Sequence, residues 1–119
     1  MLDRDAITAL LEIIGGDRAD LVDLITSFAE EAPALLAAMT AAAQGDDGAT
    51  VRRVAHTLKS NARDLGALAF AADCAALEAD LSGPGAVEGL IARVAAITGQ
   101  WTAVSAALMA EIDGAGETN

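Results

Sequence analysis

The sequence predicts an all-α protein, and three observations support this fold class. The 119-residue chain is 54% hydrophobic and only 3% aromatic, and its apolar content is dominated by alanine and leucine, which are the strongest helix formers. It has no alternating run rich in Val, Ile and Thr of the kind that forms strands. Short glycine-containing breaks divide it into helix-length segments. The expected architecture is an up-down antiparallel four-helix bundle with a short N-terminal cover helix.

The expected helices follow one another with short connections. They cover residues 3–14, 17–44, the stretch from the Asp46-Asp47 cap to about 65, 68–81 and about 86–112. Pro33 lies in the middle of the second segment, which is therefore either one kinked helix or two helices. Asp46 or Asp47 can cap the third helix, and Gly66 ends it. We expect one domain over residues 1–113 and a flexible glycine-rich tail over 114–119.

Composition excludes several classes of function. A formal net charge of −11 argues against nucleic acid or anionic membranes as partners, because both require clustered positive charge. The single cysteine, Cys74, rules out an internal disulfide and a Cys-rich zinc site. The first residues lack the basic and apolar regions of a secretory signal, and no apolar stretch reaches the roughly 20 residues of a membrane span. We therefore expect a cytoplasmic protein, and a monomer.

The only histidine, His56, lies on the outer face of the third predicted helix. Each helical residue advances about 100°, which places His56 about 140° from Val51. The apolar stripe of this helix, expected to face the core, is Val51, Val54, Ala55, Leu58, Ala62 and Leu65. His56 therefore faces solvent.

Positive charge gathers around this histidine. Four of the seven Lys and Arg residues lie on the outer half of the same helix, and none of the 18 acidic residues falls between Thr50 and Arg63. These four are Arg52, Arg53, Lys59 and Arg63; Ser60, at position i+4, lies beside the imidazole. Like charges one turn apart mildly destabilise a helix, so a cause other than helix stability is reasonable.

An exposed imidazole with cationic neighbours suits phosphoryl transfer. Fixed Lys and Arg side chains can neutralise the oxygens of the transferred group, and the same cations favour the neutral, nucleophilic ring. A metal site is a weaker interpretation, because no other ligand shares the face of His56. Acyl transfer by Ser60 and His56 lacks the third group that would orient the ring.

Two stretches of the chain resemble the histidine-containing phosphotransfer (HPt) domain family. "AHTLKSNARDLGA" (55–67), followed by "ADCAALE" (72–78), is similar to the family signature at Ala55, His56, Leu58, Lys59, Gly66, Ala67, Leu77 and Glu78. The resemblance extends over roughly residues 3–112 and implies a four-helix bundle with an exposed active histidine. In this family the histidine takes a phosphoryl group from a receiver-domain aspartate and passes it to another receiver.

The resemblance assigns roles to individual residues. His56 would be the phosphoacceptor, Lys59 the cation that assists transfer, and Gly66 the small residue that closes the helix near the docking surface. From their positions around His56 on the helix, Arg52, Ser60 and Arg63 are expected to line the binding site, where Arg63 would help to stabilise the transferring group. Ser60 stands where the family usually has glycine. The chain would be a phosphocarrier without a cofactor of its own, because the receiver supplies Mg²⁺. Expected partners are response-regulator receiver domains and a hybrid histidine kinase.

Two alternatives stay open from the sequence. One is a degenerate relative that binds a receiver or kinase as a non-catalytic scaffold or inhibitor, which Ser60 favours and the retained His56 and Lys59 disfavour. The other is a dimerising phosphotransferase related to kinase core domains. Among the remaining residues, Cys74, Phe28, Phe70 and Trp101 are interpreted as packing, and Asp73, Glu78 and Asp80 as a solvated acidic face.

Overall fold

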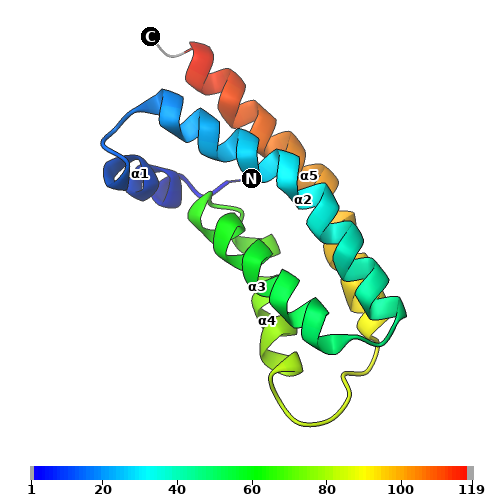
Figure 1. The fold of residues 1–119 in the computed structure, drawn as a ribbon. Helices are drawn as coiled ribbons and strands as arrows, with labels where there is room; N and C mark the ends of the chain where they lie inside the picture. Colours follow the sequence, from blue (N-terminus) through cyan, green and yellow to red (C-terminus); the bar gives the residue numbers. More distant parts are fainter. Residues whose placement is uncertain (1, 118–119) are drawn as a thin grey trace.

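The structure, a computed structural model, describes residues 2–117, with the side chains of 2–114. Five helices and no strand occur in this range: α1 (Arg4–Ile13), α2 (Arg18–Gln44), α3 (Gly48–Asp64), α4 (Leu68–Leu81) and α5 (Leu90–Glu117) (Figure 1). The predicted all-α class is confirmed. Within the described range, no helix combines the length and apolar character needed to cross a bilayer.

Three aspartates start the first three helices as side-chain caps. The Asp3 carboxylate accepts the amide of Ala6 at 3.0 Å, and the Asp17 carboxylate accepts that of Ala19 at 2.8 Å. At α3 the cap is Asp47, which accepts the amide of Thr50 at 3.2 Å. Such bonds satisfy amides that have no partner within the first helical turn. Because caps are local, the boundaries predicted from the sequence hold closely for α1 to α4.

The two longest helices differ from expectation in detail. Helix α2 runs through Pro33 as a single helix, which excludes the alternative of two separate helices. Helix α5 begins at Leu90 instead of near Ala86, because Gly89 adopts a left-handed φ of 66° that an α-helix does not contain. It also continues to Glu117, through residues predicted as tail. Glycine disfavours a helix by only about 1 kcal/mol relative to alanine, and no proline follows to end it. Residues 118–119 lie outside the described range.

The helices pack into an elongated body of 52 × 22 × 18 Å. Helix α2 lies beside α3 and α5, α4 lies beside α3 and α5, and α1 covers α2 and α3 at one end (Figure 1). Every long helix contributes fully buried side chains to one core: Leu21, Ile25, Met39, Val51, Leu58, Phe70, Leu77, Val94 and Leu108. Trp101 contacts the rings of Phe28 and Phe70 at centroid distances of 5.4 and 6.1 Å, which confirms these aromatics as packing residues.

Core packing fixes the orientation of α3. The whole predicted stripe, from Val51 to Leu65, is buried. Because the opposite side of a helix must then face outward, His56 points away from the core as predicted.

Candidate functional site

His56 lies in an open hollow on the outer face of α3. Its side chain is 58% exposed, and the hollow has a volume of about 530 Å³. The lining comes from two turns of α3 and one residue of α4: Ala49, Thr50, Arg52, Arg53, His56, Thr57 and Glu78. An exposed ring in a hollow of this size can meet a group that a partner protein presents.

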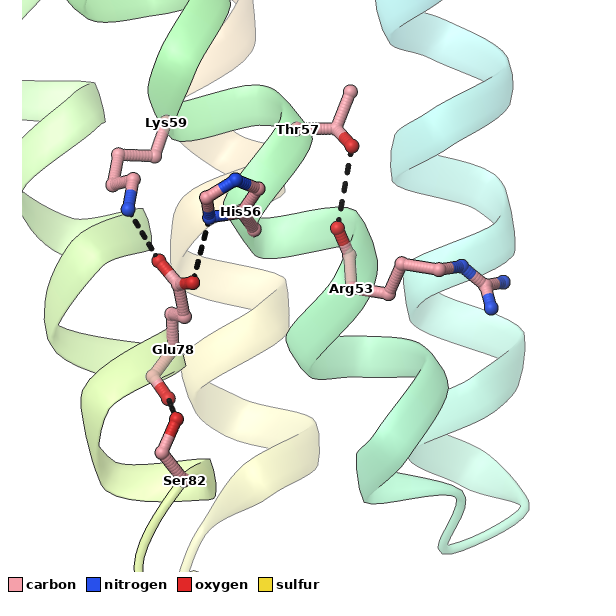
Figure 2. Close-up of polar contacts among 6 residues, drawn as sticks. All are labelled: Arg53, His56, Thr57, Lys59, Glu78 and Ser82. Atoms are coloured by element: carbon pink, nitrogen blue, oxygen red, sulfur yellow. Dashed lines mark hydrogen bonds and ion pairs between the residues drawn. The ribbon is translucent and has the colours of Figure 1, made fainter.

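Glu78 of α4 connects His56 to Lys59. One carboxylate oxygen lies 2.7 Å from His56 Nδ1, and the other accepts a hydrogen bond from Lys59 Nζ at 2.6 Å (Figure 2). The expectation that Glu78 belongs to a solvated acidic face is therefore wrong. The expectation that the charged neighbours of the His56 ring are all cations is also wrong. Periodicity within α3 could not reveal this contact, because Glu78 lies 22 residues further along the chain. The matched Leu77-Glu78 pair was the one sequence signal for it.

The other members of the predicted acidic face also have partners. Asp80 forms an ion pair with Arg93 at 2.8 Å, and Asp73 accepts a hydrogen bond from Gln100 at 2.5 Å. Both bonds join α4 to α5 at the surface. These aspartates therefore have structural contacts and lie outside the hollow.

The contact with Glu78 decides which ring nitrogen is nucleophilic. An ionised carboxylate only accepts hydrogen bonds, so Nδ1 of His56 must carry the proton. In a neutral imidazole the other nitrogen, Nε2, then has a free lone pair. Figure 2 shows Nε2 on the edge of the ring that faces the turn carrying Lys59. The site therefore presents a defined nucleophilic atom.

The carboxylate is held in its charged form. The hydrogen bond from Lys59 is the largest influence on the pKa of Glu78 and lowers it from its ordinary value of 4.5. Burial opposes this effect, and the weaker influence of the bond with His56 again lowers the pKa. The side chains of Lys59 and Glu78 are only 18% and 19% exposed. Lys59 is thus committed to Glu78 and does not extend freely into solvent.

The remaining predicted site residues lie on both sides of His56 along α3. Arg52 and Arg53 line the hollow on the N-terminal side, although the Arg53 guanidinium points away from the ring (Figure 2). Ser60 and Arg63 lie on the C-terminal side, one and two turns beyond His56. In the part of the chain that the structure describes, none of these three arginines has an ion pair.

Gly66 is not brought to the hollow. It has a left-handed φ of 84°, and its carbonyl accepts the amide of Asp3 at 2.8 Å. A Cβ at this position would lie 2.8 Å from the nitrogen and 2.9 Å from the oxygen of Asp3. Gly66 therefore ends α3, as expected, and seats the N-terminal segment against it, while its assignment as a binding residue stays a prediction.

Two other candidates carry no chemistry at this surface. Cys74 is fully buried, and its burial raises the pKa of the thiol to about 12, so the reactive thiolate is suppressed. Across residues whose placement is described, no three His, Cys, Asp or Glu side chains gather in a way that could hold a metal ion.

Comparison with known proteins gives one result. The family model described as "Hpt domain" matches residues 23–112, which include His56, Lys59 and Glu78. No curated protein and no solved structure matches the chain. The matched range begins within α2 and ends within α5, so it contains both helices that build the hollow.

Proposed function

Because the chain belongs to the Hpt domain family, whose members are phosphocarriers of two-component phosphorelays, we propose that His56 is its phosphoacceptor. In this proposal His56 takes a phosphoryl group from a receiver-domain aspartate and passes it to another receiver. One observation carries it above all: the ring is exposed, Glu78 holds its Nδ1, and Nε2 is free.

The transfer step follows from this geometry. The Nε2 lone pair attacks the phosphorus of the receiver's aspartyl phosphate, an N–P bond forms, and the P–O bond to the aspartate breaks. The electron pair of that bond leaves with the aspartate carboxylate. No proton has to leave Nε2, because Nδ1 carries the ring proton. The positive charge that develops on the imidazole lies opposite the Glu78 carboxylate, which stabilises it.

Lys59 would assist this step mainly through Glu78. Its ammonium group lies 2.6 Å from one Glu78 oxygen and keeps the other oxygen directed at His56. We expect the Lys59→Ala variant to fold and to transfer more slowly, because Glu78 loses the bond that fixes it. Unchanged transfer kinetics in stopped-flow measurements would remove Lys59 from the mechanism.

We place receiver docking on the surface that joins α2 and α3. An apolar groove of about 200 Å³ lies where α1, α2 and the C-terminal part of α3 meet, and it is lined by Leu10, Leu24, Ser27, Phe28, Glu31, Asn61, Asp64 and Leu65. Leu24, at 43% exposure, presents apolar surface to a partner. The arginines beside His56 would face the acidic, Mg²⁺-holding pocket of the receiver, which supplies the only metal this transfer needs.

The wider proposal concerns the scaffold and its setting. We infer that α2 to α5 form the antiparallel four-helix bundle of an Hpt domain with α1 as cover, since neighbouring helices in the chain pack together and α2 and α5 close the ring. We further propose a cytoplasmic monomer that performs no catalysis without a receiver. Its measured mass in solution would separate it from the dimerising phosphotransferase.

Phosphotransfer from receivers tests the central proposal. Incubation with phosphorylated receivers encoded in the same genome should give acid-labile, base-stable label on the chain. The His56→Gln variant should take up none. Label on His56→Gln would refute the assignment, and a folded wild-type chain that binds receivers without ever taking label would favour the scaffold alternative.

The docking surface is tested separately. Leu24→Asp places a charge in the groove. The variant should bind a receiver more weakly in titration calorimetry, because it lacks the apolar contact area that Leu24 buries on docking. Ile91→Asp on α5 is the matched control: Ile91 is 55% exposed and lies outside the groove. Equal affinities of the two variants would place docking elsewhere.

A further inference from the structure

We propose that Ser60 and Arg63 together hold the phosphoryl group on phosphorylated His56, and so set the equilibrium of transfer. This inference rests on the proposed function and goes beyond it by assigning a thermodynamic role to the residue that replaces the usual glycine. The alternative for Ser60 is a passive one, in which its side chain only crowds an approaching receiver.

The orientation of the His56 ring determines the direction in which a phosphoryl group on it would extend. Glu78 occupies Nδ1, and Nε2 lies on the edge facing the turn of Lys59 (Figure 2). A phosphoryl group on Nε2 therefore extends along α3 toward its C-terminal end. Arg52 and Arg53 lie on the other side of the ring, one turn back.

Two polar residues, Ser60 and Arg63, lie on the C-terminal side of His56. Ser60 and Arg63 lie about 40° and 20° from the direction of His56 around the helix, with rises of roughly 6 and 10 Å along it. Helical side chains lean toward the N-terminus, so a side chain as long as that of Arg63 can extend back over Ser60 toward His56. Both residues can therefore reach the same phosphoryl oxygens.

The hydrogen-bonding capacity of both side chains is unused. Three other hydroxyls, those of Thr40, Thr57 and Ser82, donate to the carbonyl four residues earlier. Over the described residues, the Ser60 hydroxyl has no such bond, and the Arg63 guanidinium, which is exposed, has neither a hydrogen bond nor an ion pair. Lys59, by contrast, is held by Glu78. On the C-terminal side of His56, Ser60 and Arg63 thus offer a hydroxyl and a guanidinium without partners among the described residues, and a guanidinium binds phosphate oxygens in a bidentate manner.

This arrangement predicts a shift in equilibrium. Hydrogen bonds to the phosphoryl oxygens exist only in phosphorylated His56, so they favour that state over the receiver's aspartyl phosphate. A neutral donor contributes about 2- to 10-fold and a charged donor about 10-fold or more in an equilibrium constant. Crowding by Ser60 would instead change the forward and reverse rates by the same factor.

The test measures the equilibrium constant of phosphotransfer with a receiver that phosphorylates the wild-type chain. Ser60→Ala and Ser60→Gly should each shift label toward the receiver by about 2- to 10-fold, and Arg63→Gln by about 10-fold. Arg18→Gln is the matched control, because Arg18 is exposed at the start of α2 and should leave the equilibrium unchanged.

Other outcomes overturn the inference in distinguishable ways. If Ser60→Gly speeds both directions equally and the equilibrium stays that of the wild type, Ser60 only crowds the partner. If Arg63→Gln shifts the equilibrium no more than Arg18→Gln does, Arg63 does not touch the phosphoryl group. In both cases the wild type still takes label on His56, so the proposed function stands; it fails only if the wild type takes none.

Discussion

At the level of single residues, Glu78 determines what His56 presents to a partner. Its carboxylate lies 2.7 Å from Nδ1 and thereby assigns the proton to that nitrogen. In the proposed transfer, this contact with α4 is what directs the exposed imidazole of α3 to attack through Nε2. Lys59 also depends on Glu78, because its ammonium group is already hydrogen-bonded to the Glu78 carboxylate when an incoming group arrives.

Glu78→Gln should slow phosphotransfer by about 10-fold or more. The amide can still accept from Nδ1, but it no longer carries the negative charge that balances the developing imidazolium, and hydrogen bonds to charged groups are the stronger ones. Rapid-quench measurements with a phosphorylated receiver give the rate. Asp73→Asn removes a charge from the same helix without touching His56 and serves as control. A rate equal to that of the control would contradict the proposed role of Glu78.

Gly66→Ala should lower the free energy of unfolding by about 2 kcal/mol or more. A left-handed φ costs a non-glycine residue about 1–2 kcal/mol, and the added Cβ would also lie 2.8 Å from the Asp3 nitrogen. Gly85→Ala is the matched control, because Gly85 has a φ of 88° with nothing within 4 Å of its Cβ position. Urea denaturation should show the larger loss for Gly66→Ala. Equal losses would mean that the contact with Asp3 is not tight in solution.

At the level of elements, capping side chains near in sequence determine where most helices begin. Tertiary packing determines whether a helix continues through a residue such as proline. Asp3, Asp17 and Asp47 start helices through bonds within three residues, so their effect can be read from the sequence. Pro33 shows the opposite case, because α2 continues through it. Buried side chains on both sides of Pro33, such as Phe28, Ala32 and Leu36, hold the two halves of α2 on one core.

Pro33→Ala should stabilise the protein by about 1–2 kcal/mol. An interior proline removes a helical hydrogen bond and its ring clashes with the preceding turn, at a cost of about 3 kcal/mol, partly offset by the reduced freedom of the unfolded chain. Pro33 is exposed, so its replacement leaves the core intact. Pro84→Ala, in the loop between α4 and α5, should show no such gain. If the urea midpoints of Pro33→Ala and Pro84→Ala shift by the same amount, Pro33 does not strain α2.

At the level of the whole molecule, the packing of α3 against α4 and against α1 and α2 creates the candidate functional surface. Residues 55–67 carry the histidine, but α4 lies beside α3 (Figure 1). The hollow exists because α4 brings Glu78 to it. The groove at the other end of α3 requires α1, α2 and α3 together. A partner would therefore meet a surface that no single helix supplies.

The stability of the molecule should fall with acid in a way that depends on Glu78. Its pKa is lowered in the folded state, so the carboxylate contributes stability above its ordinary pKa of 4.5, and this contribution is lost as pH falls through the lowered value. Urea midpoints from about pH 6 to pH 2 should separate wild type from Glu78→Gln at the upper end and converge at the lower end. Asp47, whose pKa is also lowered, titrates in both proteins and cancels in the comparison. Parallel curves would contradict this linkage.

The sequence by itself determined the helical class, the boundaries of α1 to α4 to within a residue or two, and the outward face of His56. These features depend on interactions over three or four residues, namely caps, glycine breaks and the period of the apolar stripe. Only the tertiary structure decided the partner of His56, the buried role of Gly66 against Asp3 and the single course of α2. The physical reason is distance along the chain: contacts between residues 22 or 63 positions apart depend on how helices pack, which no local pattern encodes.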